Sequence, residues 1–336
     1  MNSILSHSIP LKNVIENLAQ QLGTTVEKNC QEYSLRVPEK YGRGKIMGVN
    51  FQKGMEILLY NCYFYEDLEI RFIVDEIHPL KFLFCESGEV NHRFENGTKF
   101  HKLDVYENII IASCRKNGHI LQFKGKTQVK INSLEIDRKK FGVAMNCELK
   151  DLGPRMELLF RDIKAENSFF HHGNYSLHMA DLFLDIENSS RKDFISRISL
   201  EGNAYKMLSL QLLQYNDDMV LPIHRSVLKK FEIKLILQAS DIIKNEIRDF
   251  TTVQDLALLV GINTNKLQSG FKALYGTTVN EYIHKRRLDL AKNLLKNSEY
   301  SISEIVYLIG LTSKSYFSKI FKKKYGILPS RLRQKS

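Results

Sequence analysis

Two stretches near the end of the sequence, 263–276 and 312–326, repeat one arrangement of small polar and lysine side chains. On a helical wheel these side chains gather on one side of each stretch. The first stretch offers Thr264, Asn265, Lys266, Gln268, Ser269 and Lys272. The second offers Ser313, Lys314, Ser315, Ser318, Lys319, Lys322 and Lys323. Short hydroxyl and amide groups can hydrogen-bond the edges of bases, and lysine can pair with phosphates.

The other sides of the two stretches are apolar. We expect the buried residues to be Leu267, Phe271 and Leu274 in the first stretch, and Tyr316, Phe317, Ile320 and Phe321 in the second. A helix lying on a membrane would turn large apolar residues toward lipid. A purely solvated face would have no reason to repeat its hydrogen-bonding positions in two copies. The pattern therefore favours two helices that pack on a small core and present their polar sides to nucleic acid.

Each stretch is the second half of a longer repeat, 252–276 and 301–326. The copies open with Thr252-x-x-Asp255 and Ser301-x-x-Glu304. Both sequences have the form of a capping box, in which the two side chains bond backbone N–H groups at a helix start. A glycine then ends the first helix of each copy, and hydroxyl or amide residues start the second. This order of elements predicts two helix-turn-helix units.

Some residues of this region are expected to shape it without touching a partner. They are Gly261, Gly276, Arg287, Gly310, Phe271, Phe321, Gly326 and Pro329. Arg287 lies in the segment 278–297, which is long enough for about five turns of helix and has a wide apolar arc. We expect a helix packed on both sides that joins the two copies, with Arg287 bracing them. Gly270 interrupts the second helix of the first copy, at a cost of roughly 1 kcal/mol relative to alanine.

The basic residues of the chain are concentrated in its last third. The formal net charge is +11. Residues 230–336 hold 19 Lys and Arg and 9 Asp and Glu, whereas residues 1–229 hold 30 and 29. The basic third is also rich in apolar residues, so it is not a solubility tail. A localised basic surplus in a folded segment predicts that this region binds a polyanion.

The first half of the chain has a different pattern. Short β-branched and aromatic runs between residues 31 and 137, separated by turn residues, predict an all-β sandwich or barrel, after a short helix at 11–22. From residue 151 the period becomes helical. A proline-containing break at 216–224 predicts a linker. The expected fold is α+β and multidomain, with a β-rich region at 1–150, a helical connector at 151–222 and an all-α region at 230–333.

The remaining polar clusters carry no specific catalytic pattern. His171 and His172, with His178 nearby, are expected to be ordinary loop histidines, and His78, His92, His101 and His119 are single and separated in the sequence. The cysteines are scattered without a CxxC pair and should be reduced; they are Cys30, Cys62, Cys85, Cys114 and Cys147. The glycines of 41–48 precede a strand-like run, so a hairpin turn is expected there instead of a phosphate loop. We therefore expect no enzyme activity, no metal and no cofactor.

Residues 230–333 resemble the DNA-binding domain of the AraC/XylS family of transcription regulators. The resemblance rests on "VQDLALLVGINTNKLQSGFKALYG", "RRLDLAKNLL" and "ISEIVYLIGLTSKSYFSKIFKKKYGILPSRLR", and on Gly326-x-x-Pro329-Ser330. It implies two helix-turn-helix units, 252–276 and 301–326, joined by a helix at 278–297. Their recognition helices, at about 264–275 and 314–325, would enter successive major-groove faces of one DNA.

The β-rich half is similar to the cupin-like sensor domains of part of that family. The segment "LEGNAYKMLSLQLLQ" is similar to the helical segment after the sensor in siderophore-responsive regulators. The expected partners are promoter DNA, RNA polymerase, an unidentified small-molecule effector and a second copy of the chain. A metal-dependent cupin-type enzyme and a non-specific nucleic-acid-binding protein stay open as alternatives. The start of the chain has neither a basic nor an apolar leader region, so a cytoplasmic location without membrane contact is expected.

Overall fold

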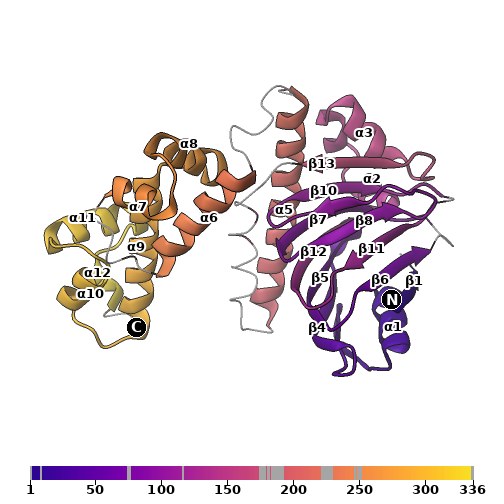
Figure 1. Cartoon of the computed structure of the whole chain (residues 1–336), viewed down its shortest axis with the longest axis horizontal. Helices are drawn as coiled ribbons and strands as arrows, with labels where there is room; N and C mark the ends of the chain where they lie inside the picture. Colours follow the sequence, from indigo (N-terminus) through magenta and orange to yellow (C-terminus); the bar gives the residue numbers. More distant parts are fainter. Residues whose placement is uncertain are drawn as a thin grey trace. The chain divides into compact units, whose positions relative to one another are not determined.

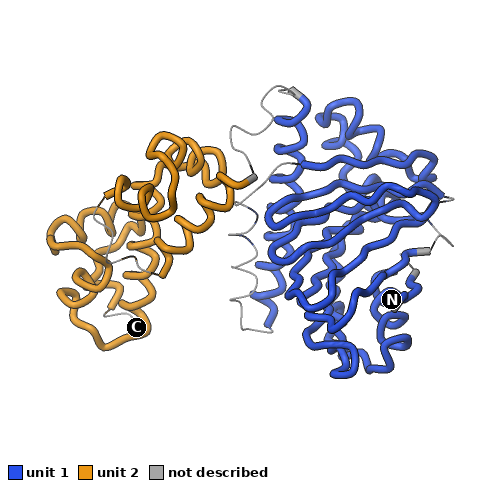
Figure 2. The backbone as a smooth tube through the Cα atoms, viewed as in Figure 1, with its two compact units in different colours: residues 1–222 blue, residues 223–336 orange. Residues whose placement is uncertain are grey.

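The computed structural model describes residues 2–7, 10–73, 77–115, 117–173, 179, 182, 193–220, 230–245, 247 and 252–333. The chain divides into two compact units, residues 1–222 and 223–336 (Figure 2). Among the described helices, none has the length and apolar character needed to cross a membrane. The expected fold class, β-rich in the first half and helical with two helix-turn-helix units at the end, is confirmed.

The first unit is built on two β-sheets (Figure 1). The smaller sheet has the order β1 (Asn2–His7), β6 (Leu68–Ile73), β11 (His119–Phe123), β8 (Val90–Phe94) and β9 (His101–Leu103). The larger has the order β13 (Phe169–Gly173), β10 (Asn108–Ala112), β7 (Leu80–Ser87), β12 (Gln128–Ile136), β5 (Met55–Phe64), β4 (Gly42–Asn50), β3 (Glu32–Arg36) and β2 (Val26–Asn29). Strand β1 runs parallel to β6, and the other described pairs are antiparallel.

The alternation of side chains along these strands places one apolar face of each sheet against the other. Ile70 of β6 and Leu121 of β11 join Leu58 of β5 and Ile131 of β12 in one buried cluster. Helix α1 (Leu11–Leu22) packs on β1, β3 and β4 through one apolar stripe, so the helix expected at 11–22 is confirmed. The core of the first unit therefore lies between the sheets, and α1 extends it.

Helices cover part of the outer face of the larger sheet. They are α2 (Arg138–Ala144), α3 (Pro154–Arg161) and α5 (Phe194–Val220), with the short 3-10 turns η1 (Gln52–Gly54) and η2 (Glu148–Asp151). Helix α5 packs on β13 and β12. Its Gln214 accepts a hydrogen bond from the side-chain amide of Asn108, at 3.0 Å. The strands under these helices are consequently buried on both faces.

Three expectations for this unit are wrong in detail. His171 and His172 lie on strand β13, paired with β10, and not in a loop. The glycines of 41–48 lie inside β4, where a Cβ on Gly42 or Gly44 would come within 2.0–2.2 Å of a carbonyl oxygen of β5. The predicted break at 216–224 begins too early, because α5 continues to Val220. His178, the rest of that break at 221–224, and most of the helical pattern at 174–188 lie outside the described residues.

The second unit is helical throughout its described residues. Its helices are α6 (Lys230–Asn245), α7 (Val253–Val260), α8 (Thr264–Tyr275), α9 (Val279–Asn297), α10 (Ile302–Leu308), α11 (Lys314–Tyr325) and α12 (Pro329–Arg333). Helix α8 packs on α6 and α9, whereas α10 and α12 pack on α9 from the second copy of the repeat. The described part of the chain holds no group of three or more His, Cys, Asp and Glu side chains placed for a metal ion, and the five cysteines are free.

Candidate nucleic-acid interface

Side-chain caps fix where the four helices of the repeat begin. The cap residue of each helix accepts a hydrogen bond from a backbone N–H three residues on, and these residues are Thr252 (3.1 Å), Asn263 (2.8 Å), Ser301 (3.2 Å) and Ser313 (3.2 Å). In the second copy the carboxylate of Glu304 also accepts from the Ser301 N–H, at 2.6 Å, which completes a capping box. The helix starts expected from the sequence are therefore confirmed.

The four predicted turn glycines all have left-handed backbone angles. Their φ values are +75° at Gly261, +66° at Gly276, +71° at Gly310 and +72° at Gly326. A residue with a Cβ rarely adopts this region, so these positions suit glycine. Each helix-turn-helix therefore has a sharp turn between its helices and a second one after its last turn.

Aromatic side chains form the core of each unit on the side predicted from the wheel. Phe271 is fully buried in the first, with its ring centroid 5.3 Å from that of Tyr282 on α9. Phe317 and Phe321 are fully buried in the second, with ring centroids 5.4 Å apart. Leu288 and Ala291 of α9 belong to the same cluster. The burial of these aromatics sets which side of α8 and α11 is left for solvent.

Helix α9 contributes to both cores, as its wide apolar arc indicated. It begins with a capping box between Thr278 and Glu281 that the sequence pattern had not singled out. Arg287 is half-buried and donates to the backbone carbonyl of Ile247, at 3.4 Å. Burial lowers the pKa of Arg287, and the nearby Tyr316 partly offsets this. Arg287 thus bonds Ile247, which lies between α6 and α7, and interacts electrostatically with Tyr316 of α11.

Helix α11 presents the most open polar side of the domain. Ser313, Lys314, Ser315, Lys319, Lys322 and Lys323 are exposed, and Ser318 is half-buried. The four lysines of this set have no ion-pair partner among the described residues. Lys324, in contrast, lies 2.6 Å from the carboxylate of Asp289 on α9 and bonds a backbone carbonyl there. Four ammonium groups on α11 are therefore available to a polyanion.

Helix α8 differs, because half of its predicted contacts are already used within the unit. Lys266 forms an ion pair with Glu232 of α6, whose side chain is only 3% exposed. Gln268 is half-buried and accepts a bond from the N–H of Val279 at the start of α9, at 3.2 Å. Ser269 donates to the backbone carbonyl of Lys266, at 3.2 Å. Asn265 and Lys272 stay exposed, and Thr264 is half-buried.

Tyr316 is exposed, whereas the helical wheel predicted that it would be buried. It was expected in the core, but its side chain is 44% exposed. Its ring centroid lies 6.5 Å from that of His284 on α9. The core of this small unit covers only the arc of Phe317 and Phe321, so the neighbouring position remains outside. Tyr316 therefore borders the polar side of α11, a position that wheel arithmetic had assigned to the interior.

Both units are similar to known protein families. Residues 42–222 match the family model of the regulatory protein PchR N-terminal domain, and residues 256–335 match a helix-turn-helix domain model. The chain is 28% identical over 230 residues to a probable transcriptional regulator LumQ of Photobacterium leiognathi, covering 63% of this chain and 87% of that protein.

Two further relatives match between a quarter and a third of the chain. The xylose operon regulatory protein of Escherichia coli is 34% identical over 98 residues, covering 29% of this chain and 25% of that protein. The transcriptional activator RhrA of Rhizobium meliloti is 38% identical over 85 residues, covering 25% of this chain and 27% of that protein. The chain thus spans about a quarter of the length of these two relatives.

Two capped helix-turn-helix units on a shared helix, with an open basic side, define a DNA-binding transcription regulator. The PchR N-terminal domain model matches more than half of the chain. The chain therefore belongs to the AraC/XylS family of transcription regulators, in the group with the PchR-type N-terminal domain.

Proposed function

We propose that this regulator selects its promoter sites mainly through α11, with α8 making fewer base contacts. The observation that carries this proposal is the exposed row of serines and lysines on α11, beside the partly engaged α8. Ser315 and Asn265 would contact base edges, and Lys319 and Lys322 would contact phosphates. Both helices would lie in the major groove of one DNA, one helical turn apart.

The test is recovery of bound fragments from sheared genomic DNA with the purified full-length protein. Few enriched sites, each with two short motifs about one helical turn apart, are the expected result. The binding free energy at such a site should exceed that at scrambled DNA by at least ~4 kcal/mol. Diffuse recovery with no motif would instead identify a non-specific nucleic-acid-binding protein and would overturn the proposal.

The remaining roles divide by region. Residues 1–150 would sense a small molecule, 151–222 would connect and dimerise, and 230–333 would bind DNA and engage RNA polymerase. The names of the relatives, a xylose operon regulator and a transcriptional activator, support a regulator that responds to a signal. Helix α5 supports a homodimer, because Phe194, Ile195 and Ile198 in its first turns are all more than half exposed.

Two measurements address these roles directly. Mass determination in solution should give twice the chain mass of 39.0 kDa if the chain dimerises. Metal analysis of the purified protein addresses the competing cupin-type enzyme. Stoichiometric iron, zinc or manganese would favour that enzyme, and its absence would leave a non-catalytic regulator.

A further inference from the structure

The larger sheet of the first unit carries a basic hollow of about 360 Å³. The residues that line it lie on β3, β4, β5 and β12, and they are Arg36, Arg43, Gly44, Lys45, Asn61 and Gln128. Their sequence neighbours belong to the buried core cluster, among them Leu35, Ile46, Cys62 and Val129. Because successive side chains of a strand point to opposite faces, the cations of the hollow point away from the core. The hollow is therefore separate from the space between the two sheets.

Strand pairing brings the three cations of the hollow together. The register of β3 with β4 places Arg36 directly opposite Lys45. Arg43 lies two positions before Lys45 on β4, so the two side chains share a face of the sheet. Like charges at directly opposite positions of neighbouring strands destabilise a sheet. The arrangement therefore lowers stability unless a negative charge lies among the cations.

The negative charge near the hollow is small. Glu27 of β2 lies 3.7 Å from the Nε of Arg36, but these side chains are 60% and 82% exposed, so the pair contributes little. The Arg43 guanidinium lies 4.8 Å from the centroid of the Tyr63 ring, and the Lys45 ammonium lies 4.0 Å from the sulfur of Met47. Neither cation has an ion-pair partner among the described residues. Two positive charges of the hollow thus lack a carboxylate in the described part of the chain.

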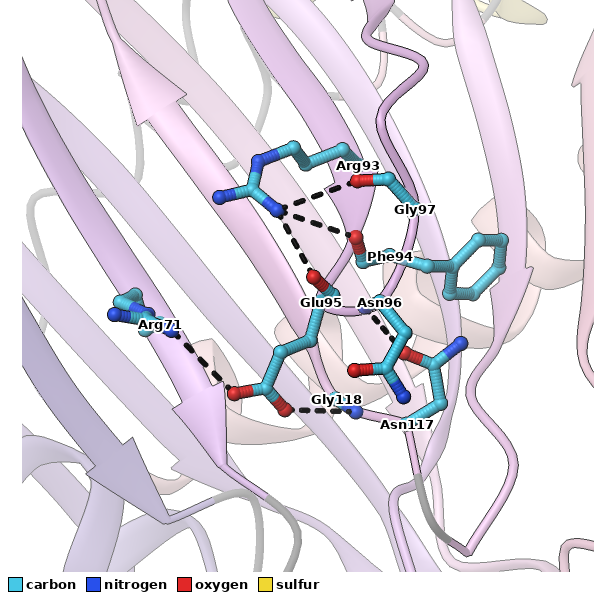
Figure 3. Close-up of polar contacts among 8 residues, drawn as sticks. All are labelled: Arg71, Arg93, Phe94, Glu95, Asn96, Gly97, Asn117 and Gly118. Carbon is cyan, nitrogen blue, oxygen red and sulfur yellow. Dashed lines mark hydrogen bonds and ion pairs between the residues drawn. The ribbon is translucent and has the colours of Figure 1, made fainter.

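The outer side of the smaller sheet offers a contrast, because its arginines are bonded within the fold (Figure 3). The Arg71 guanidinium lies 3.5 Å from the carboxylate of Glu95. The Arg93 guanidinium donates to the carbonyls of Glu95 and Gly97, at 3.1 and 3.4 Å. The Glu95 carboxylate also accepts from the Gly118 N–H, at 3.3 Å. These arginines stabilise strand ends, whereas the cations of the hollow have no comparable bonds.

The polar groups of the hollow indicate the chemistry of a ligand. The side-chain oxygen of Asn61 accepts a bond from the Gln128 amide, at 2.7 Å, which leaves the Asn61 NH₂ group as a donor. A guanidinium offers a fork of N–H donors that matches phosphate oxygens, and an ammonium adds a compact charge. The cations share one hollow at the lower end of the size range of small-molecule pockets, roughly 300–1,000 Å³. The hollow therefore suits a compact group with several acceptor oxygens and more than one negative charge.

We propose that this basic hollow binds the phosphate group of a small phosphorylated compound. The Arg43 guanidinium and the Lys45 ammonium bond the phosphate oxygens, and the Asn61 amide donates a further hydrogen bond. The bound phosphate also offsets the repulsion between Arg36 and Lys45. The site lies outside the helix-turn-helix units, so this inference goes beyond the proposed function and does not depend on it.

A titration with inorganic pyrophosphate tests the site. The full-length protein is labelled with ¹⁵N, and the backbone amide of Gly44 and the side-chain amide of Asn61 report on the hollow. We expect saturable shifts of both signals, and a dissociation constant that rises roughly tenfold or more in Arg43→Gln and in Lys45→Met. Arg71→Gln is the matched control, since it removes one positive charge from the same unit outside the hollow, and its dissociation constant should stay within about twofold. No saturable shift, or an equal loss in the control, would overturn the proposal.

A stability comparison tests the same site without a ligand. Lys45→Met retains most of the aliphatic stem and removes the charge opposite Arg36. In a buffer free of phosphate we expect its melting temperature to rise by about 1–2 °C, because the like-charge contact is lost. Pyrophosphate should then raise the melting temperature of the unsubstituted protein more than that of the variant. A lower melting temperature for Lys45→Met without ligand would show that the ammonium stabilises the fold, and would overturn the proposal.

The DNA backbone is the other source of phosphate groups, and a third measurement distinguishes it. Binding of the full-length protein to scrambled DNA is measured at a series of salt concentrations. We expect Arg43→Gln and Lys45→Met to leave the slope of log affinity against log salt unchanged. A slope lowered by about one in each variant would assign the hollow to the DNA backbone and would overturn the proposal. Site selection on genomic DNA is measured separately, so a failure here is distinguishable from a failure of the proposed function.

Discussion

The two helix-turn-helix units share one sequence pattern but use their polar sides differently. In the first unit, Lys266 and Gln268 of α8 bond residues of α6 and α9. In the second, the corresponding side of α11 is exposed, and Lys324 and Tyr325 at the end of α11 bond Asp289 of α9. The two copies of the repeat therefore share their buried cores and their turns. Their outward side chains differ, because some bond other helices of the unit and others are exposed.

The difference follows from the neighbours of each unit. Helix α6 packs against α7 and α8, and it brings the buried carboxylate of Glu232 to the outward side of α8. A buried carboxylate needs a compensating charge, and Lys266 supplies it. The second unit has α12 in place of such a helix, and α12 packs on α9 and α11 through its own apolar residues. Lys314, Lys319, Lys322 and Lys323 of α11 thus have no ion-pair partner among the described residues.

The largest effect is expected for the feature that the two units share, their buried aromatic cores. Phe321→Ala and Phe271→Ala should each lower the free energy of unfolding of their own unit by roughly 3–5 kcal/mol, because each ring is fully buried. Hydrogen exchange of the full-length protein should show faster exchange in α10 and α11 for the first variant, and in α7 and α8 for the second. A change near zero in either variant would contradict the burial of that ring.

The next test separates base contacts from structural bonds. Ser315→Ala and Asn265→Ala should each reduce discrimination at one base pair of the selected site by about 1–3 kcal/mol. Gln268→Ala should leave base preference unchanged and lower stability by about 1 kcal/mol, because it removes the bond to the Val279 N–H. Competition binding with single-base variants of the site measures both. Relaxed base preference in the Gln268 variant would erase the contrast between the helices.

Lysines allow a finer test with a matched control. Lys319→Ala and Lys322→Ala should each lower the slope of log affinity against log salt by about one, if each ammonium meets a phosphate. Lys324→Ala on the same helix should leave the slope nearly unchanged, since its ammonium is bound to Asp289. Binding isotherms at a series of salt concentrations give the slopes. Equal losses for all three variants would mean that only total charge matters.

The smallest expected effect concerns the helix that the units share. Thr278→Ala removes the cap and the capping box at the start of α9 and should cost about 1 kcal/mol of stability. Thr278→Ser is the control, since serine retains the hydroxyl. Denaturant unfolding of the two variants gives the difference. Because Gln268 of α8 bonds the Val279 N–H at the start of α9, hydrogen exchange in Thr278→Ala should become faster in α8 as well as in α9. Faster exchange in α9 alone would contradict this coupling.

Local signals in the sequence were sufficient for the repeat. Thr252, Ser301 and the turn glycines act on residues three or four positions away, so their effect can be predicted from neighbours alone. The ion pair of Lys266 with Glu232 joins positions 34 residues apart, and no periodicity reports it. Tyr316 shows a related limit, because a helical wheel gives directions and not how far a small core extends around the helix.

Two buried histidines of the first unit, whose ring centroids lie 5.8 Å apart, illustrate the same limit more strongly. His92 and His119 lie on adjacent strands, and their meeting depends on the pairing of β8 with β11. The sequence predicted the strands but not their register, because the register depends on turns and on contacts across the whole sheet. Contacts between residues that are far apart in a β-rich sequence therefore cannot be predicted from the sequence around each residue. The strand β13, hidden between helical patterns, was missed for a similar reason.

Helix α9 has one further consequence, which concerns phasing along the DNA. With 19 residues at about 1.5 Å each, it is a rigid rod of about 28 Å, close to one turn of B-form DNA at about 34 Å. Each residue inserted into the rod would turn the second unit by about 100° around the axis and move it by about 1.5 Å. If both recognition helices enter one DNA as proposed, the length of this helix would set the spacing of the two half-motifs.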